Sequence, residues 1–520
     1  MKKTILTTFI ASMAMAGSMA QTVDVPRLVV GITIDQLRSD YLQAYYPLYG
    51  DGGFKMLLEK GQVYSNVQYP FSPVDRASAM ASVVTGTVPY NHGIIGEEWM
   101  SRNELHAVYC VDDKQYKGID TDDYSSPKHL LVSTIGDELK VATKGKAFVY
   151  SIAPNREAAV LAAGHAADWA MWIDSQNGKW AGTTYYGQLP SWLRYITNGS
   201  ISDKISSLTW KPSNEKVGSY NYYLTTNQKP FSHKFAGNSK YRVFKSSGLI
   251  NEEITKAARI CLEKGCAGMD DVTDFLSICY YAGDFHGASE SEKTTELQDT
   301  YTRLDAELSE LLLNIDRTVG LDKTLIFVTS TGYDQTEGHS DVENFRIPTG
   351  DFYINRCATL LNMYLCAMYG NGQYVQSFHD NQIYLDHKHL EQRQLKLAEV
   401  LQHCEDFLFQ FSGIRDVFTS RRIAQGAWTS GISNIRNGYN PKCSGDILIQ
   451  VVPGWNLVNE DRGTKKMLRD SFFEFPLIFF GYQLKPEKIS VPVTIDCIAP
   501  TVAHHIRIRA PNGCSSAPLF

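Results

Sequence analysis

Carboxylate and histidine side chains follow several of the apolar runs in this sequence, and these residue types bind divalent metals. Asp35 directly ends a buried apolar run. In an open α/β sheet ligands bind at the C-terminal edge of the strands, where such a carboxylate would lie. Asp284 with His286, and Asp334 with His339, follow two later runs. These pairs could supply metal ligands, although a chain with 13 histidines also contains such pairs by chance.

The elements that would position these residues alternate between strand and helix. Predicted strands cover residues 27–34, 146–152, 274–281 and 324–330, and predicted helices cover residues 41–60, 77–85, 250–264 and 297–315. Gly61 and Gly86 are the stop signals of the first two helices. This alternation predicts an α/β fold, with a mostly parallel sheet sandwiched by helices.

Two stretches interrupt the alternation. Residues 175–245 are rich in Trp, Tyr, Asn, Ser and Gly and show no clear helical period. Residues 346–470 contain a predicted helix of their own at 390–411 and a strand at 447–452. We interpret both as insertions over the C-terminal edge of the sheet, within one large domain that covers residues 21–520.

The N-terminal residues 1–20 have the pattern of a secretory signal peptide. Lys2 and Lys3 precede an apolar stretch at residues 5–15, and residues 18–20 form a small-x-small cleavage site. The pattern predicts a mature chain that starts near Gln21 and is exported to the periplasm, the outer membrane or the medium. No later segment is apolar enough to predict a transmembrane helix.

Composition excludes some partners and leaves others open. The net charge is −6 and no basic stripe occurs, so a nucleic-acid partner is not expected. No C-x-x-C pair occurs among the ten cysteines, so a structural zinc site is not expected either. An oxidising compartment could pair Cys261 with Cys266 and Cys497 with Cys514, but the connectivity stays open.

Several short motifs occur in the order and spacing of a known family. They are residues 34–42 (IDQLRSDYL), 85–89 (TGTVP), 92–94 (HGI), 163–165 (AGH), 299–305 (DTYTRLD), 437–446 (NGYNPKCSGD), 453–455 (PGW) and 498–501 (IAPT). Together they resemble the secreted phosphate-irrepressible alkaline phosphatases of the alkaline phosphatase and nucleotide pyrophosphatase-phosphodiesterase superfamily. The resemblance implies an alkaline phosphatase-like core. It also implies hydrolysis of phosphate esters with two zinc ions and a nucleophilic Thr or Ser.

Most residues that this chemistry needs are replaced. Asp35 fills the first metal-ligand position, but Arg76 stands at the nucleophile position and cannot attack phosphorus. The other metal-ligand positions that the resemblance implies are occupied by Tyr280, Asp284, Gly332, Tyr333 and Glu474. The sequence therefore predicts that the zinc ligands and the catalytic nucleophile are lost.

The groups that would hold the phosphate are also replaced. A polar Asn of the family falls on Glu97, and the clamping Lys and Arg fall on Asn155 and Glu157. The carboxylates Glu97, Glu157, Asp284 and Glu474 would repel a phosphate dianion in the absence of metals. Clustered carboxylates also suit Ca²⁺, which stays open as an alternative to pairing with arginine or solvation.

Other polar residues of the motifs have structural explanations. Ser78 lies two residues beyond Arg76 on a small-residue helix, which turns it away from the nucleophile position. His92 is expected to cap or pack a turn, and His165 to be structural or to line the pocket. The charged residues of the 299–305 motif are expected to form an ion-pair face on one helix.

Two functions follow from this pattern. The first is a catalytically inactive binding or scaffold protein with a protein partner or a glycan-type ligand. The second is a hydrolase of phosphate or sulfate esters with a rearranged metal site at Asp35, Asp284, His286 and His339. The expected remnant pocket contains Asp35, Arg76, Glu97, Glu157, Asp284, Tyr333 and Glu474. In it, Arg76 is expected to replace the metal as the counter-charge of Asp35 or of another carboxylate such as Glu474.

Overall fold

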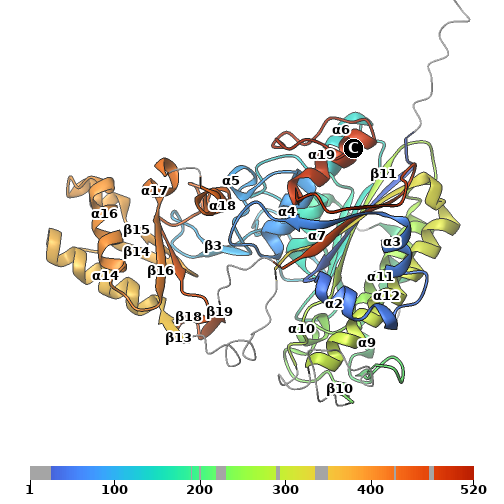
Figure 1. Cartoon of the computed structure of the whole chain (residues 1–520), viewed down its shortest axis with the longest axis horizontal. Helices are drawn as coiled ribbons and strands as arrows, with labels where there is room; N and C mark the ends of the chain where they lie inside the picture. Colours follow the sequence, from blue (N-terminus) through green and yellow to red (C-terminus); the bar gives the residue numbers. More distant parts are fainter. Residues whose placement is uncertain are drawn as a thin grey trace, which may run out of the picture.

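The protein has a larger lobe built around one sheet and a smaller lobe beside it (Figure 1). The computed structural model describes residues 25–188, 190–197, 201–217, 230–287, 293–333, 349–426, 429–467 and 473–520. The predicted signal peptide, Asp334 and His339 lie outside these residues.

The centre of the large sheet is parallel. Strand β1 (Leu28–Asp35) lies between β11 (Asp274–Tyr281) and β12 (Thr324–Ser330), and β6 (Val149–Ala153) and β7 (Trp169–Ile173) continue the parallel order beyond β11. Every residue of β1 is buried, because both faces of the strand are covered. The predicted α/β fold is therefore confirmed, with Asp35 at the end of an inner strand.

The outer strands make the sheet mixed. Strand β20 (Phe475–Gly481) pairs antiparallel with β12, and β8 (Trp180–Thr183) pairs antiparallel with β7. The remaining strands of this sheet are β2 (Gln62–Gln68), β5 (Gly118–Ile119), β21 (Glu487–Ile489) and β22 (Val493–Thr494). Strand β8 falls inside the stretch 175–245, so this part of the predicted insertion belongs to the sheet itself.

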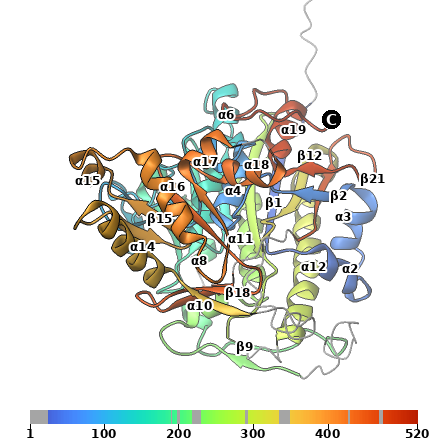
Figure 2. The same ribbon diagram turned by 60° about the vertical axis from the view of Figure 1, so that its left-hand side comes forward.

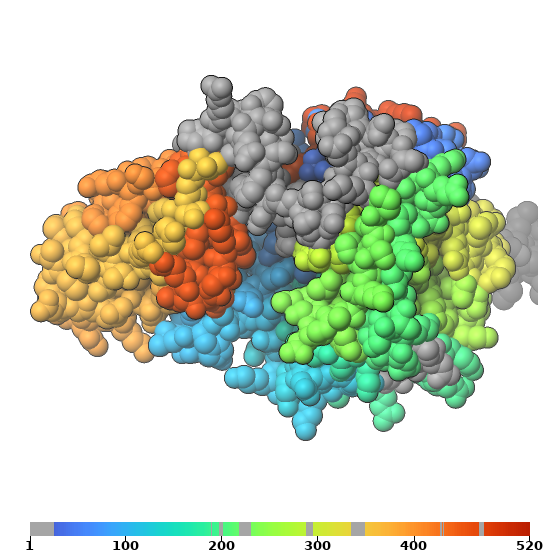
Figure 3. Space-filling model, turned by 90° about the horizontal axis from the view of Figure 1, so that it is seen from below, coloured from blue at the N-terminus to red at the C-terminus, as the bar shows by residue number. Residues whose placement is uncertain are grey.

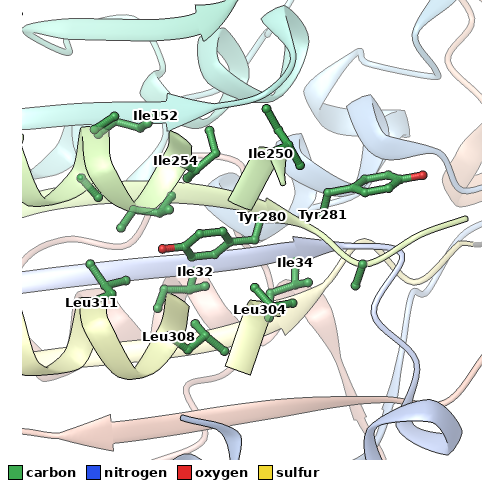
Figure 4. Packing of buried hydrophobic residues seen from close by; sticks show 14 of the residues in the cluster. Ile32, Ile34, Ile152, Ile250, Ile254, Tyr280, Tyr281, Leu304, Leu308 and Leu311 are labelled. Atoms are coloured by element: carbon green, nitrogen blue, oxygen red, sulfur yellow. The ribbon is translucent and has the colours of Figure 1, made fainter. Parts of the chain in front are cut away.

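Helices cover both faces of the sheet. One face packs against α11 (Ile250–Gly265) and α12 (Lys293–Thr318), whose isoleucines and leucines meet those of β1 in Figure 4. The other face packs against α4 (Arg76–Thr85), α7 (Arg156–Ala163) and α19 (Ile498–His505). The remaining helices and hairpin strands of this lobe are α2 (Ser39–Ala44), α3 (Phe54–Lys60), α5 (Pro89–His92), α6 (Ile135–Ala142), α8 (Arg194–Thr197), α9 (Ile201–Lys204), α10 (Lys240–Lys245), β3 (Glu98–Met100), β4 (Ala107–Tyr109), β9 (Thr209–Trp210) and β10 (His233–Lys234).

The smaller lobe has two sheets of its own. Its elements are β13 (Gly350–Tyr353), α14 (Ile354–Tyr369), β14 (Val375–His379), β15 (Gln382–Leu385), α15 (His387–Gln392), α16 (Leu397–Leu408), β16 (Ile414–Thr419), α17 (Ser420–Gln425), α18 (Ser430–Gly438), β17 (Ile447–Val451), β18 (Trp455–Asn459) and β19 (Thr464–Met467). Figure 2 places α14 and α15 at the outer edge of this lobe. Arg102 of the larger lobe pairs with Asp446 at 3.0 Å and so joins the two lobes. In Figure 3 a blue segment of the larger lobe lies against the orange smaller lobe.

Two predicted helices are broken. The helix predicted at residues 41–60 is split into α2, a short 3₁₀ turn at Tyr46–Leu48 and α3. A side chain at Gly53 would place its Cβ 2.2 Å from the carbonyl oxygen of Asp305, so the chain must turn here on a glycine. The helix predicted at 390–411 is split between α15 and α16 at Gln394, whose φ of 57° is left-handed.

Two chain-wide features complete the fold. No helix of the described residues is long and apolar enough to span a membrane. All ten cysteines lie in the described residues, and all are free thiols. Neither of the pairs that an oxidising compartment could form, Cys261 with Cys266 or Cys497 with Cys514, is bonded in this structure. Cys261 is buried in α11, whereas Cys266 is exposed in the left-handed position that ends this helix.

Candidate functional site

Asp35 is held at the end of β1 by a neighbouring strand. It is 1% exposed and pairs in register with Tyr281 of β11. The hydroxyl of Thr331, just after β12, donates to Asp35 Oδ1 at 2.9 Å and accepts from the backbone N–H of Gln36 at 2.9 Å. Sequence reasoning did not assign Thr331 this role, because only the parallel register of β1 and β12 brings it beside Asp35.

Arg76 is the first residue of α4, and the cap of this helix explains its direction. Asp75 is the N-cap, and its carboxylate accepts a hydrogen bond from the backbone N–H of Ser78. In turn, the Ser78 hydroxyl accepts a hydrogen bond from the backbone N–H of Asp75. This capping box uses the Ser78 side chain as a structural group. Arg76 lies at the N-terminal end of α4, and its side chain reaches Asp35 at the C-terminal end of β1.

The guanidinium of Arg76 contacts three carboxylates at once. Nη1 donates to Asp35 Oδ2 at 2.9 Å, Nε to Glu157 Oε1 at 2.5 Å and Nη2 to Glu97 Oε1 at 2.9 Å. Nη1 also lies 3.4 Å from the Tyr333 hydroxyl. The predicted pairing of Arg76 with Asp35 is confirmed.

Glu474 does not join this cluster. Its side chain is exposed, and its backbone carbonyl accepts a hydrogen bond from the N–H of Ser39 at 2.8 Å. The expectation that Glu474 could pair with Arg76 was wrong, because the chain before β20 turns this side chain to solvent.

The pKa values of Glu157 and Glu97, which both contact Arg76, are shifted in opposite directions. Burial raises the pKa of Glu157, but Arg76 and a 2.5 Å hydrogen bond from Tyr109 outweigh burial and lower that pKa to about 2. Burial raises the pKa of Glu97 to about 8, where nearby carboxylates reinforce burial and Arg76 opposes it. Burial lowers the pKa of Arg76, but its carboxylate neighbours raise that pKa well above its usual value. Arg76 therefore stays a cation, as Asp35 requires.

A matched pair of substitutions tests this difference. Glu157→Gln is expected to destabilise the protein by about 2–3 kcal/mol at neutral pH, because it removes an ionised partner of a buried guanidinium. Glu97→Gln is expected to be near neutral at about pH 4.5 and to stabilise the protein at neutral pH, where the wild-type carboxyl is protonated in the folded state but ionised in the unfolded state. The raised pKa of Glu97 means that wild type loses stability relative to Glu97→Gln as the pH rises from about 4.5 towards about 8. Melting temperatures measured from pH 5 to 9 check both, and equal effects of the two substitutions would contradict this assignment.

The residues at the remaining ligand positions do not converge. Tyr280 points into the core, where its hydroxyl lies 2.9 Å from that of Thr255, while Tyr281 points the other way towards the end of the strand (Figure 4). Asp284 is buried, and its backbone carbonyl accepts from the Tyr281 hydroxyl at 2.7 Å. His286 is exposed.

Gly332 and Tyr333 also have structural roles. Gly332 has a φ of 67°, and a Cβ there would lie 2.5 Å from the ring of Tyr69. Tyr333 brings its hydroxyl to 3.5 Å from Asp35. The first position thus requires a glycine, and the second supplies a neutral polar contact in the Arg76 cluster.

The described residues do not fit the zinc ions that the resemblance implies. Zinc in such sites needs several Asp and His side chains that converge on one point. Within the described part of the chain no group of three or more His, Cys, Asp or Glu side chains is placed to hold a metal ion. The oxygens of Asp35, Glu97 and Glu157 face a guanidinium instead. The same arrangement disfavours Ca²⁺, since a fixed cation already occupies the centre of the carboxylates.

A cavity of about 650 Å³ opens beside the Arg76 cluster. It is lined by Gln36, Arg76, Glu97, Tyr109, Asp123, Asn155, Arg156, Glu157, Trp172, Ile173, Ser175, Ser239, Arg242, Val243, Lys245, Ser246, Tyr281 and His286. Glu97 also lines a second cleft, of about 630 Å³, between the two lobes. Asn155 and Glu157, which stand at the clamp positions that the resemblance implies, therefore lie in the cavity. Lys245 and Arg242 were not anticipated, because they come from α10, a late part of the stretch 175–245.

The histidines of the motifs are structural. His92 is buried between the hydroxyl of Ser82, 3.0 Å from Nε2, and the N–H of Ile94, which donates to Nδ1 at 3.1 Å; burial lowers the pKa of His92 to about 3. His165 Nδ1 lies 3.0 Å from Asp137, and this contact raises the pKa of His165. Neither histidine is among the residues that line the 650 Å³ cavity.

The 299–305 motif forms a structural ion-pair face only in part. Arg303 Nε donates to Asp299 at 2.7 Å, as predicted, but Asp299 is fully buried and also accepts from the indole N–H of Trp210 at 2.6 Å. Asp305 instead accepts from the backbone N–H groups of Gly50 and Phe54, both at 2.7 Å. Asp305 therefore holds the start of α3, which explains the close approach at Gly53.

Comparisons with known proteins agree with this fold over nearly its whole length. The family model of type I phosphodiesterase / nucleotide pyrophosphatase matches residues 29–472. Alkaline phosphatase PafA of Elizabethkingia meningoseptica is 29% identical over 544 residues, which cover 100% of this chain and 98% of the relative. Alkaline phosphatase PhoV of Synechococcus elongatus is 30% identical over 516 residues, which cover 95% of this chain and 92% of the relative.

Solved structures give the same result. The crystal structure of wild-type PafA superposes with a TM-score of 0.83 at 27% identity, covering 96% of this chain and 99% of that one. A solved PafA variant carries substitutions at a threonine, an asparagine, a lysine and an arginine. With sequence and fold in agreement, the chain belongs to the type I phosphodiesterase / nucleotide pyrophosphatase family and has the alkaline phosphatase-like fold.

Proposed function

We propose that this chain is an exported member of its family that has lost metal-dependent hydrolysis and acts as a binding protein. The single observation that carries the proposal is the Arg76 guanidinium, which lies among Asp35, Glu97 and Glu157. The resemblance puts a nucleophile at Arg76 and a metal ligand at Asp35. An ion pair between these two residues leaves neither of them free for that chemistry.

The hydrogen-bond count of Arg76 supports the same conclusion. A guanidinium has five N–H groups, and four contacts to described residues use them here, three to carboxylates and one to the Tyr333 hydroxyl. An incoming phosphate would have to displace a buried carboxylate, which then loses its counter-charge. Arg76 therefore balances the charge of the protein itself and does not replace the phosphate clamp.

The substituted PafA positions add support. The threonine, asparagine, lysine and arginine changed in that phosphatase variant are the residue types that the resemblance assigns to the nucleophile, its polar neighbour and the phosphate clamp. In this chain those positions hold Arg76, Glu97, Asn155 and Glu157. All four replacements line the 650 Å³ cavity, so the changes are concentrated where the chemistry of the family would occur.

A hydrolase with a rearranged site is the second candidate, because the relatives are named alkaline phosphatases. It would use Asp35, Asp284, His286 and His339 as ligands. Elemental analysis of the purified protein separates the two functions. The binding protein is expected to contain zinc well below one ion per chain after purification in zinc-supplemented medium, whereas a stoichiometric amount would favour the hydrolase.

The partner of such a protein is a ligand or protein outside the cell. Aromatic residues make up 12% of the chain, a composition that suits glycan or protein recognition as well as core packing. The net charge of −6 gives no support to a nucleic-acid partner. The proposal is therefore a binding or scaffold role with a glycan-type ligand or a protein partner.

Export predicts a processed N-terminus. Protein isolated from the native host is expected to begin near Gln21, because the small residues at 18–20 suit signal peptidase. N-terminal sequencing or intact mass measures this directly. Ala20→Phe provides a variant in which cleavage should be blocked, and a chain that still begins at Met1 in wild type would refute the signal peptide.

A further inference from the structure

An ammonium group that has no ion-pair partner among the described residues lies in the cavity beside the Arg76 cluster. Lys245, the last residue of α10, is 8% exposed. Its Nζ donates to the backbone carbonyl of Ile173 at 3.1 Å and to the Ser175 hydroxyl at 2.8 Å. Within the described residues it has no carboxylate within ion-pair distance. Since an ammonium has three donors, one remains for a group that enters the cavity.

The carboxylates around Lys245 already have partners. Glu157 faces Arg76 and Tyr109. Asp174 accepts from the Thr121 hydroxyl at 2.6 Å and from two backbone N–H groups of its own turn. Asp123 lies 3.6 Å from Arg156. Burial lowers the pKa of Lys245 to about 8, and the more distant carboxylates offset this only in part. A buried cation in this state is stabilised by an anion that reaches it.

Two further donors line the same cavity. Arg242 lies one turn before Lys245 on α10, is exposed, and forms no ion pair with any described residue. The indole N–H of Trp172 is buried and has no hydrogen-bond partner in the described part of the chain. The carboxylates Glu157 and Asp123 of the cavity are paired with Arg76, Tyr109 and Arg156. Among the described residues that line the cavity, the amide oxygen of Gln36 is a buried acceptor without a partner, while Lys245, Arg242 and Trp172 offer donors, so donors predominate. A donor-rich, partly buried site selects an anion.

We propose that this cavity binds a small hydroxylated organic anion, whose carboxylate, sulfate or phosphate group lies between Lys245 and Arg242. Asn155, Ser239 and Ser246 line the same cavity and are suited to hydroxyl groups of the ligand body. A volume of about 650 Å³ is sufficient for a sugar-sized molecule. The inference rests on the proposed binding function and names its ligand class, an acidic sugar.

Calorimetric titration with four probes tests the ligand class. Glucuronate, glucose 6-sulfate and glucose 6-phosphate supply the three anionic groups, and glucose is the neutral control. At least one of the acidic sugars is expected to bind and to raise the melting temperature, while glucose does neither. Absence of binding by all three acidic sugars would overturn the inference.

Variants of α10 test the position of the site. Lys245→Met should weaken binding at least about tenfold, the usual effect of losing a charge-assisted hydrogen bond. It keeps the volume of the side chain and removes a buried charge, so it should fold. Arg242→Gln changes an exposed side chain and should also weaken binding. Lys240→Met is the matched control on the same helix, does not line the cavity, and should bind like wild type. Wild-type affinity in both Lys245→Met and Arg242→Gln would contradict the proposed site.

Product analysis separates this inference from the proposed function. Binding of glucose 6-phosphate without release of phosphate supports both. Binding with turnover that depends on Lys245 supports the anion site and refutes the loss of catalysis. If the Lys245 variant loses binding, the ligand lies at α10. If wild type also shows no turnover, the protein binds this ligand without hydrolysing it.

Discussion

The purified protein is expected to hydrolyse p-nitrophenyl phosphate and bis-p-nitrophenyl phosphate no faster than buffer that contains the same zinc concentration. The resemblance puts Arg76 at the nucleophile position and Asp35 at a metal-ligand position, and the guanidinium of Arg76 lies 2.9 Å from the carboxylate of Asp35. Enzymes accelerate such reactions by about 10⁶-fold or more, so even weak residual catalysis would be visible. Initial rates of nitrophenolate release, with and without added zinc, measure the effect.

Asp35→Asn is the control that makes this result decisive. If no metal chemistry remains, the substitution leaves the background rate unchanged, because the wild-type carboxylate takes no part in turnover. PafA assayed in the same buffers shows that the conditions suit an alkaline phosphatase. Zinc-dependent turnover in wild type that disappears in Asp35→Asn would overturn the binding-protein proposal and favour the rearranged site.

Arg76→Met is expected to cost about 3–5 kcal/mol of stability at neutral pH, since it leaves buried carboxylates without a counter-charge. The side chains of Asp35 and Glu157 are each 2% exposed, so water cannot replace the guanidinium there. Thermal unfolding followed by circular dichroism measures the loss. Arg27→Met, which breaks an exposed pair with Asp271, is the matched control and should cost less than about 1 kcal/mol.

The pH dependence separates this charge effect from lost packing. Glu157 has a pKa of about 2 in the folded wild type, below its usual 4.5, so its pairing stabilises the protein above about pH 4.5 and is lost as the pH falls towards 2. The difference between wild type and Arg76→Met should therefore shrink in acid. Adding Glu157→Gln to Arg76→Met should restore part of the stability. A difference that stays constant from pH 7 to pH 3 would show that packing, and not charge, is lost.

Local sequence patterns were sufficient for the central sheet and its helices. The apolar run before Asp35 is buried on both faces, and a run of this kind with a carboxylate at its end can be read without tertiary information. The same holds for β11, β12 and α11. The helix predicted at residues 41–60 failed because Asp305, about 250 positions away in the chain, turns the backbone at Gly50 and Gly53.

For the site, the sequence by itself predicted that Arg76 stands at the nucleophile position of the family and that a buried Asp35 needs a counter-charge. Only the tertiary structure decided which carboxylates share Arg76. Glu97 and Glu157 join Asp35, whereas Glu474 turns to solvent. The physical reason is that residue type and the apolar pattern around it reveal a buried charge that needs a counter-charge. The residue that supplies this counter-charge comes from a distant strand or helix, which only the tertiary structure identifies. Lys245 shows the same limit, because its lack of a carboxylate partner in the described part of the chain is a property of the folded cavity and not of α10.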